Sequence, residues 1–156
     1  MKNGKTLHLN QYLSFRGGVE VYLLGLLDRM IEMGADVHVG HGDDAPVVSP
    51  MLEGRCHQLS ELAVATSFGG PDCVRALLER LRPDIVHVHQ LFDPGALEAA
   101  LSLAPVVLHG HDFRYLCPSS SFFRQDSMTV CAHRPGIACA ARTFADRCMS
   151  RHPASA

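Results

Sequence analysis

The sequence lacks any apolar run of about 18 residues, the length that a helix needs to cross a bilayer. It also lacks a run of lysine and arginine, and its 14 Lys+Arg against 16 Asp+Glu leave a formal net charge of −2. Such a charge balance offers no basic surface to a nucleic acid. The first ten residues join a charged start to a strand pattern, without an apolar signal core or a cleavage site. These absences predict a cytoplasmic protein with no nucleic-acid partner.

The sequence also lacks a close pair of cysteines: its six cysteines are irregularly spaced, and neighbouring ones are separated by several residues or more. Cytoplasmic cysteines stay mostly reduced, so disulfides are not the expected use. Four of the six fall near the C-terminus: Cys117, Cys131, Cys139 and Cys148. Zinc sites usually contain a pair separated by two to four residues. We therefore expect small thiols that pack a loop-rich segment and assign no metal site. A structural zinc or iron–sulfur site, with His133 in place of one cysteine, is the alternative.

Length and composition are those of one globular domain, with 47% hydrophobic residues in 156. The clearest helical pattern follows Gly17-Gly18, and Gly34 is expected to end that helix in the C′ position. Its apolar residues recur with a period of 3.6. They are Val19, Tyr22, Leu23, Leu26, Leu27, Met30 and Ile31.

Strand patterns alternate with helical ones as far as residue 110. The strands are expected at residues 5–13, 35–41, 84–89 and 106–110, with a short one near residues 56–59. The later helices are expected from Gly70 to just before Pro83 and over 94–103. This alternation predicts an α/β fold with a doubly wound, parallel, Rossmann-like sheet over residues 1–156. Residues 113–148 show no clean period and are expected to form an irregular, cysteine-rich excursion that ends in a helix over 138–149.

Ligands of open parallel sheets bind beyond the carboxyl ends of the strands. The turn Arg16-Gly17-Gly18 is expected at that edge, although neither the dinucleotide fingerprint nor a Walker A loop is present. Its position before a helix favours an anion held by backbone N–H groups, and a plain turn is the alternative. His87 and His89 lie two apart on a strand and should point together, as should His109 and His111. A metal site is conceivable there, but pocket-edge histidines are the favoured interpretation, with His111 followed by Asp112 as the best candidate for chemistry.

Three segments, "RGGVEVYLLGLLDRMIEMGADVHV", "RPDIVHVH" and "PVVLHGHDFRYLCP", resemble in order and spacing the N-terminal domain of family 4 glycosyltransferases. The resemblance covers roughly residues 5–148 and implies a retaining enzyme of GT-B fold, built from two facing Rossmann-like domains. The run "HD…CP…C…C" is similar to transferases that build bacterial surface polysaccharide.

The resemblance also implies roles. Gly17 and Gly18 would approach the diphosphate of a nucleotide-sugar, and Arg16 would add positive charge. His111 would lie near the reacting sugar as the catalytic residue, and the substrate-binding set would be completed by His89, His109 and Asp112. Family members usually carry threonine where Gly110 stands, so the local turn is expected to differ.

The family's nucleotide and most donor contacts come from a C-terminal Rossmann-like domain that the sequence does not contain. Half of a cleft stabilises only one side of the transition state, so we expect the chain to be inactive alone. It would be a truncated acceptor-side domain, or would work with a companion subunit on a glycan or lipid-linked acceptor. The nucleotide-sugar is then a substrate, and no cofactor is expected. Because many acceptors of the family are membrane-borne, the resemblance also implies that the protein could bind peripherally to the inner face of the membrane. Rival interpretations are a non-catalytic binding module and a metal-binding domain that uses the Cys/His cluster.

Overall fold

The computed structural model describes residues 4–44, 49–63, 69–124, 127–145 and 148. Contacts divide the chain into two compact units, Met1–His109 and Gly110–Ala156, and each is described by itself. The expectation of one domain over residues 1–156, with an excursion at 113–148, stays a prediction.

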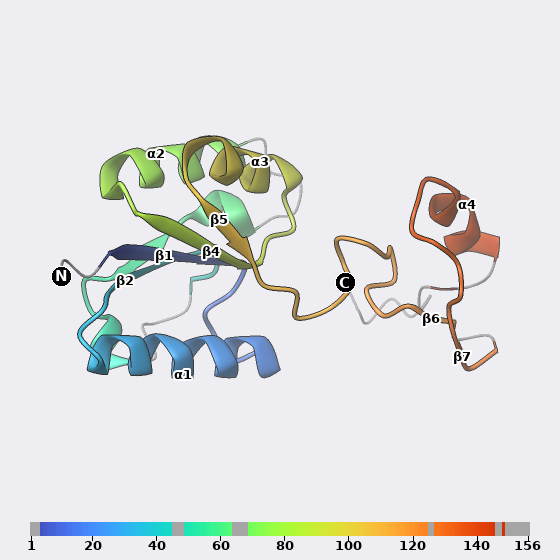
Figure 1. Ribbon diagram of the computed structural model, residues 1–156, viewed down its shortest axis with the longest axis horizontal. Coiled ribbons are helices and arrows are strands. Elements are labelled where there is room, and N and C mark those ends of the chain that lie inside the picture. The colour runs from blue at the N-terminus through green and yellow to red at the C-terminus, as the bar shows by residue number, and fades with distance from the viewer. Residues whose placement is uncertain (1–3, 45–48, 64–68, 125–126, 146–147, 149–156) are drawn as a thin grey trace. The chain divides into compact units, whose positions relative to one another are not determined.

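The first unit is a five-stranded parallel sheet with helices on both faces (Figure 1). The strands, in the spatial order β3-β2-β1-β4-β5, are β1 Lys5–Asn10, β2 Asp36–His41, β3 Cys56–Gln58, β4 Ile85–Gln90 and β5 Val106–Leu108. The helices are α1 Gly18–Glu32, α2 Gly70–Leu81 and α3 Pro94–Leu103, with 3-10 turns η1 Pro50–Leu52 and η2 Ser60–Ala63. This order is that of a doubly wound sheet, so the predicted fold class is confirmed.

Side chains that alternate along the strands build two cores. Leu7 and Leu9 of β1 belong to the core under α2 and α3, whereas Val37 and Val39 of β2 pack with α1. In Figure 1, α1 lies on one face and α2 and α3 on the other. Because successive side chains point to opposite faces, His8, between Leu7 and Leu9, points to the face that carries α1. Thr6 and His8 thus share the face of the sheet that carries α1.

Strand β1 is shorter than the predicted residues 5–13. The register with β4 shifts between Leu9 and Asn10, and the Asn10 side-chain amide donates to the Tyr12 carbonyl oxygen at 2.6 Å. That local bond turns the chain out of the sheet. Leu13 is fully buried in the core under α1. The last strand is also shorter than expected, because β5 ends at Leu108 and not at residue 110.

Local end signals set the helix boundaries as expected. Gly34 follows α1 with φ 82°, the left-handed conformation of a C′ glycine. The Asp93 side chain caps α3 by accepting from the N–H of Gly95 at 2.8 Å and of Ala96 at 3.4 Å. Within the described residues, no helix is both long and apolar enough to span a membrane.

Helix α2 ends on a strained residue. Arg82 is an exposed C-cap in the left-handed region, with φ 48° and ψ 59°, and its N–H donates to the Leu78 carbonyl at 2.8 Å. A residue with a Cβ is strained by about 1–2 kcal/mol in this conformation, and glycine is not. Glycine also makes the unfolded chain more flexible, which favours unfolding and cancels part of the gain. We expect Arg82→Gly to raise the free energy of unfolding by up to about 1 kcal/mol in urea unfolding followed by far-UV circular dichroism. Arg82→Ala, which keeps the Cβ, should give no gain; an equal gain from both would contradict the assignment.

The second unit contains little regular structure. Strands β6 Phe123–Arg124 and β7 Thr129–Val130 pair antiparallel, and helix α4 spans Ala138–Ala145. The helix predicted over 138–149 therefore starts where expected and ends by Ala145, while 146, 147 and 149 lie outside the described residues. The irregular character expected after residue 112 is confirmed for the described part of this unit.

Candidate functional site

The carboxyl edge of the sheet has its switch point between β1 and β4. The chain continues from β1 to β2 on one side and from β4 to β5 on the other, so the two strands diverge at this edge. Open α/β sheets bind ligands in the crevice at such a point. The loop after β1 leads from this edge into α1, and its glycines are therefore the first residues to examine.

Nothing in the described part of the chain requires glycine at positions 17 and 18. Gly17 is the N-cap of α1 in extended backbone, with φ −171° and ψ −163°, which any residue can adopt. Among the described residues, a Cβ on Gly18 would meet no atom within 4 Å, and one on Gly17 would meet only the Glu20 carboxylate at 3.6 Å. The helix also starts without a side-chain cap from the residues described. The first N–H groups of α1 are thus accessible to a ligand. Two glycines at this position are therefore better explained by a bound ligand than by packing within the described chain.

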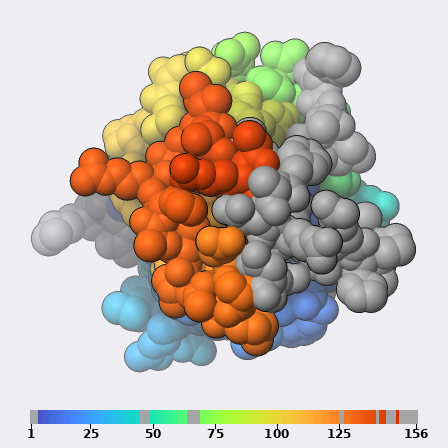
Figure 2. All heavy atoms as spheres, turned by 90° about the vertical axis from the view of Figure 1, so that its right-hand side faces the viewer, coloured from blue at the N-terminus to red at the C-terminus, as the bar shows by residue number. Residues whose placement is uncertain are grey.

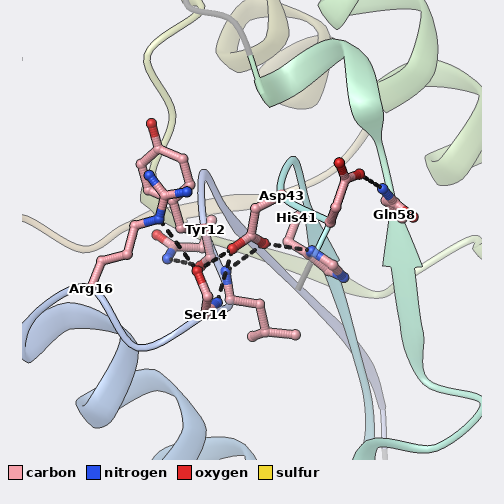
Figure 3. A network of polar contacts seen from close by, with 9 residues as sticks. Tyr12, Ser14, Arg16, His41, Asp43 and Gln58 are labelled. Atoms are coloured by element: carbon pink, nitrogen blue, oxygen red, sulfur yellow. Dashed lines mark hydrogen bonds and ion pairs between the residues drawn. The ribbon is translucent and has the colours of Figure 1, made fainter. Parts of the chain in front are cut away.

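The loop that carries these glycines is anchored by Asp43, which follows β2 (Figure 3). Its carboxylate accepts from the N–H of Leu13 at 2.9 Å, from the N–H of Ser14 at 3.0 Å and from the Ser14 hydroxyl at 2.5 Å. The His41 ring nitrogen Nδ1 lies 3.0 Å from the same carboxylate. Burial by itself raises the pKa of Asp43, but the hydrogen bonds from Ser14, Leu13 and His41 outweigh it and lower the pKa to about 2. Asp43 is therefore ionised at neutral pH and holds the loop against the end of β2.

Arg16 is fixed beside the glycine turn. Its Nε donates to the Ser14 hydroxyl at 3.3 Å, and its guanidinium carbon lies 3.9 Å from the centre of the Tyr12 ring (Figure 3). The Tyr12 ring in turn packs edge-on against Phe92, with centroids 6.0 Å apart. Stacking on an aromatic face holds the cation in place while its side chain stays exposed. The predicted positive charge thus lies next to Gly17 in sequence and is oriented by two contacts.

A group of histidines lines the face of the sheet that carries α1. The rings of His87 and His89 stack with centroids 4.4 Å apart, which confirms that they point together. His8 Nδ1 lies 3.0 Å from His89 Nε2, and both residues are buried. Burial, followed by the charge of His87, lowers the pKa of His8 to about 4, so its ring is neutral at pH 7. Ring nitrogens of His8, His87 and His89 lie within 4.8 Å of one another, which gives the group the donors for a metal ion, although the His8–His89 contact has hydrogen-bond length.

His109 extends this row towards the carboxyl edge. Its half-buried ring lies 5.4 Å from that of His89 and 5.2 Å from that of Tyr22 on α1. His111 and Asp112 belong to the second unit, where Arg114 donates to the Asp112 carboxylate from Nε at 2.9 and 3.0 Å and also from Nη2. These hydrogen bonds lower the pKa of Asp112. The roles predicted for the glycines, the histidines and Asp112 in substrate binding and catalysis stay predictions.

Sequence reasoning did not find Asp43, Ser14 or His8. Asp43 stands two residues beyond the end of β2, at the same edge as the glycine turn, and that position was the available signal. His8 stands between two leucines of β1, so strict alternation placed it on the opposite face from them, opposite His87 in the register of β1 with β4. Neither signal indicates the bonding partner, because the partners lie about 30 and 80 residues away in sequence.

The comparisons with known proteins agree with this geometry. The family model for Glycosyltransferase Family 4 matches residues 16–153, from Arg16 in the glycine turn into the second unit. A search of curated proteins finds no match, and neither does a search of solved structures. The family match covers well over half of the chain. The chain has a Rossmann-like sheet, and the glycine turn at which the match begins lies at the switch point of that sheet. The chain therefore belongs to glycosyltransferase family 4.

Proposed function

We propose that this domain forms the acceptor-side half of the cleft of a retaining glycosyltransferase. Glycosyltransferases bind a sugar donor and an acceptor, and in this proposal the donor is a nucleotide-sugar. Arg16 and the backbone of Gly17 and Gly18 contact its diphosphate. The acceptor is a glycan or a lipid-linked sugar, and a second Rossmann-like domain or companion subunit supplies the facing half.

One observation carries the proposal: at an uncapped helix start, Gly18 has open space where a side chain would stand, and a Cβ on Gly17 would meet only the Glu20 carboxylate among the described residues. Such a start presents N–H groups and the positive end of the helix dipole, which suit an anion. A Cβ at either position would keep phosphate oxygens away from those N–H groups. The Asp43 hydrogen bonds support the proposal because they hold the loop in place without using the first-turn amides of α1.

The roles proposed for the remaining residues follow from the charges that develop during sugar transfer. Transfer of the sugar leaves a diphosphate whose growing negative charge needs donors on one side, while the acceptor hydroxyl approaches from the other. In this proposal Arg16 and the α1 amides stabilise the leaving group. His111, with Asp112 beside it in sequence, lies near the reacting sugar, and His89 and His109 face the acceptor.

Titration of the 15N-labelled chain with a nucleoside diphosphate tests the first of these contacts. We expect the largest amide shifts at Gly17, Gly18 and Val19. Gly18→Val should weaken binding about tenfold, equivalent to about 1.4 kcal/mol, without changing the circular dichroism spectrum, because its Cβ meets no described atom. Gly25→Ala is the matched control, since it changes a glycine in the middle of the same helix and should leave binding unchanged. Equal affinity of the Gly18→Val variant and the original chain would refute the role of the turn.

A further inference from the structure

The second unit, Gly110–Ala156, has no hydrophobic core in its described residues. Of the residues in this unit whose side chains the structure describes, none is fully buried, and Met128, Val130 and Ile137 have exposed fractions of 74%, 77% and 96%. The space-filling view shows side chains of this unit, coloured orange to red, at the surface (Figure 2). Regular structure is limited to two strands of two residues each and the eight-residue helix α4. A unit of this size buries too little apolar surface to offset its chain entropy and usually depends on a cross-link.

A cavity with room for one ion lies among its cysteines. The cavity measures about 30 Å³, which is about the space of one water molecule. All four C-terminal cysteines line it, namely Cys117, Cys131, Cys139 and Cys148. They are spread along the unit: in the turn ahead of β6, directly after β7, in the first turn of α4 and beyond its end. One bound ion would therefore tie together every element of the unit.

The four thiols are free of disulfides, as are the other cysteines of the described chain. Cys139 and Cys148 lie 3.7 and 3.9 Å from backbone carbonyl oxygens of Arg134 and Arg142. Cys117 lies 3.1 Å from the Ser119 hydroxyl and accepts hydrogen bonds from backbone N–H groups of residues 119, 121 and 122. The cysteines of the first unit differ, since Cys56 and Cys73 pack against its two hydrophobic cores. Among the cysteines of the described residues, the C-terminal four line this cavity together.

We propose that Cys117, Cys131, Cys139 and Cys148 bind one zinc ion that holds the second unit together. Four cysteines line this one cavity, and four thiolates in a tetrahedron are a usual ligand set of structural zinc. Soft thiolates select zinc over magnesium or calcium. No carboxylate lines the cavity in the described residues. Each thiol gives up its proton to solvent on binding, and the four thiolates leave the site with two negative charges. Arg142, which also lines the cavity, lies where its positive charge can offset part of that charge.

The sequence spacing argued against this site because it contains no close cysteine pair. A close pair is needed only where one turn supplies two ligands. Here each ligand comes from a different element, and the irregular loops between them bring the sulfur atoms to one cavity. The inference concerns the stability of this unit and does not depend on the proposed sugar transfer.

Elemental analysis of the full chain, produced without a polyhistidine tag and kept reduced, decides the proposal. We expect one zinc ion per chain, and cobalt in its place should give the visible and near-ultraviolet bands of tetrahedral thiolate coordination. Cys131→Ser should lose the zinc, whereas Cys56→Ala, a matched change in the first unit, should keep it. A reduced chain that remains free of zinc after incubation with a zinc salt overturns the proposal. Iron with inorganic sulfide, or disulfides found among the four cysteines, overturns it equally.

A second measurement needs no variant. Removal of zinc with a chelator should speed tryptic cleavage after Arg142 at least about tenfold, and added zinc should restore protection, because a ligand that binds only the folded form stabilises it. Cleavage within residues 69–109 should not change. Cleavage after Arg142 at the same rate with and without zinc would show that the ion does not hold this unit.

Discussion

Replacing Asp43 with asparagine is expected to lower the free energy of unfolding by about 2 kcal/mol at pH 7. The carboxylate accepts hydrogen bonds from two backbone N–H groups, one hydroxyl and one imidazole, and it is only 7% exposed. Asparagine has the same shape but carries no charge and turns an NH2 group towards donors. The cost should equal that of protonating Asp43, whose pKa falls from 3.8 to about 2 on folding. Each unit of pKa corresponds to about 1.4 kcal/mol.

The dependence on pH distinguishes this mechanism from a simple packing defect. Because the pKa is lower in the folded chain, the stabilisation is fully present above about pH 4 and is lost as the pH falls through about 2. The difference between the original chain and Asp43→Asn should therefore shrink over that range. Urea unfolding followed by far-UV circular dichroism at pH 7, 4 and 2.5 measures it, and the absence of tryptophan makes fluorescence a poor substitute.

The neighbouring Asp44 offers a matched control. It is exposed, and its described side-chain partner is Gln58. Asp44→Asn should change the free energy of unfolding by less than about 0.5 kcal/mol at any of these pH values. A constant difference between the original chain and Asp43→Asn from pH 7 to 2.5 would contradict the role given to the ionised carboxylate.

Gly42→Ala is expected to destabilise the chain by about 3 kcal/mol, at the upper end of the range for overpacking. A Cβ at this position would lie 2.6 Å from the Ala63 nitrogen and 2.7 Å from the Leu62 carbonyl carbon. Both are backbone atoms of η2, so the clash cannot be relieved by turning a side chain. The N–H of Gly42 also donates to the Gln11 carbonyl at 3.0 Å, which ties the same position to the loop after β1. Thermal and urea unfolding of the variant check the size of the effect.

Gly25→Ala gives the opposite result for the same chemical change. Gly25 lies in the middle of α1, and a Cβ there would meet no described atom within 4 Å. Alanine in a helix is better than glycine by about 1 kcal/mol, so this variant should be more stable than the original chain. Equal effects of the two substitutions would mean that the crowding at Gly42 is relieved by a shift of η2.

Much of the fold could be predicted from local signals. The α3 range of 94–103 was correct because Asp93-Pro94 forms a local cap, and α1 ended as expected because Gly34 adopts a left-handed turn. Both signals act within a few residues of the helix end. The doubly wound parallel sheet follows from alternating strands and helices with short connections, since right-handed crossovers leave few arrangements. The ends of β1 and β5 were wrong because apolar composition continues past the point where pairing stops.

The candidate site could be predicted only in part. The glycine turn and the His87–His89 pair follow from positions adjacent in sequence, and the structure puts both histidines on one face. Asp43 reaches back across 30 residues to Leu13 in the loop that it holds, and His8 meets His89 across 81. The four cysteines of the cavity likewise come from separate elements. Composition and periodicity carry no information about such partners.

The sequence by itself determined the order of strands and helices, the helix ends and the family, because each depends on residues close together in the chain. Tertiary structure decided which side chains share a loop, a sheet face or a cavity. Packing brings distant segments together, and the direction of each side chain depends on where its strand or turn ends. Anchoring of the glycine turn by Asp43 and the meeting of four thiols around one small space are both consequences of that packing.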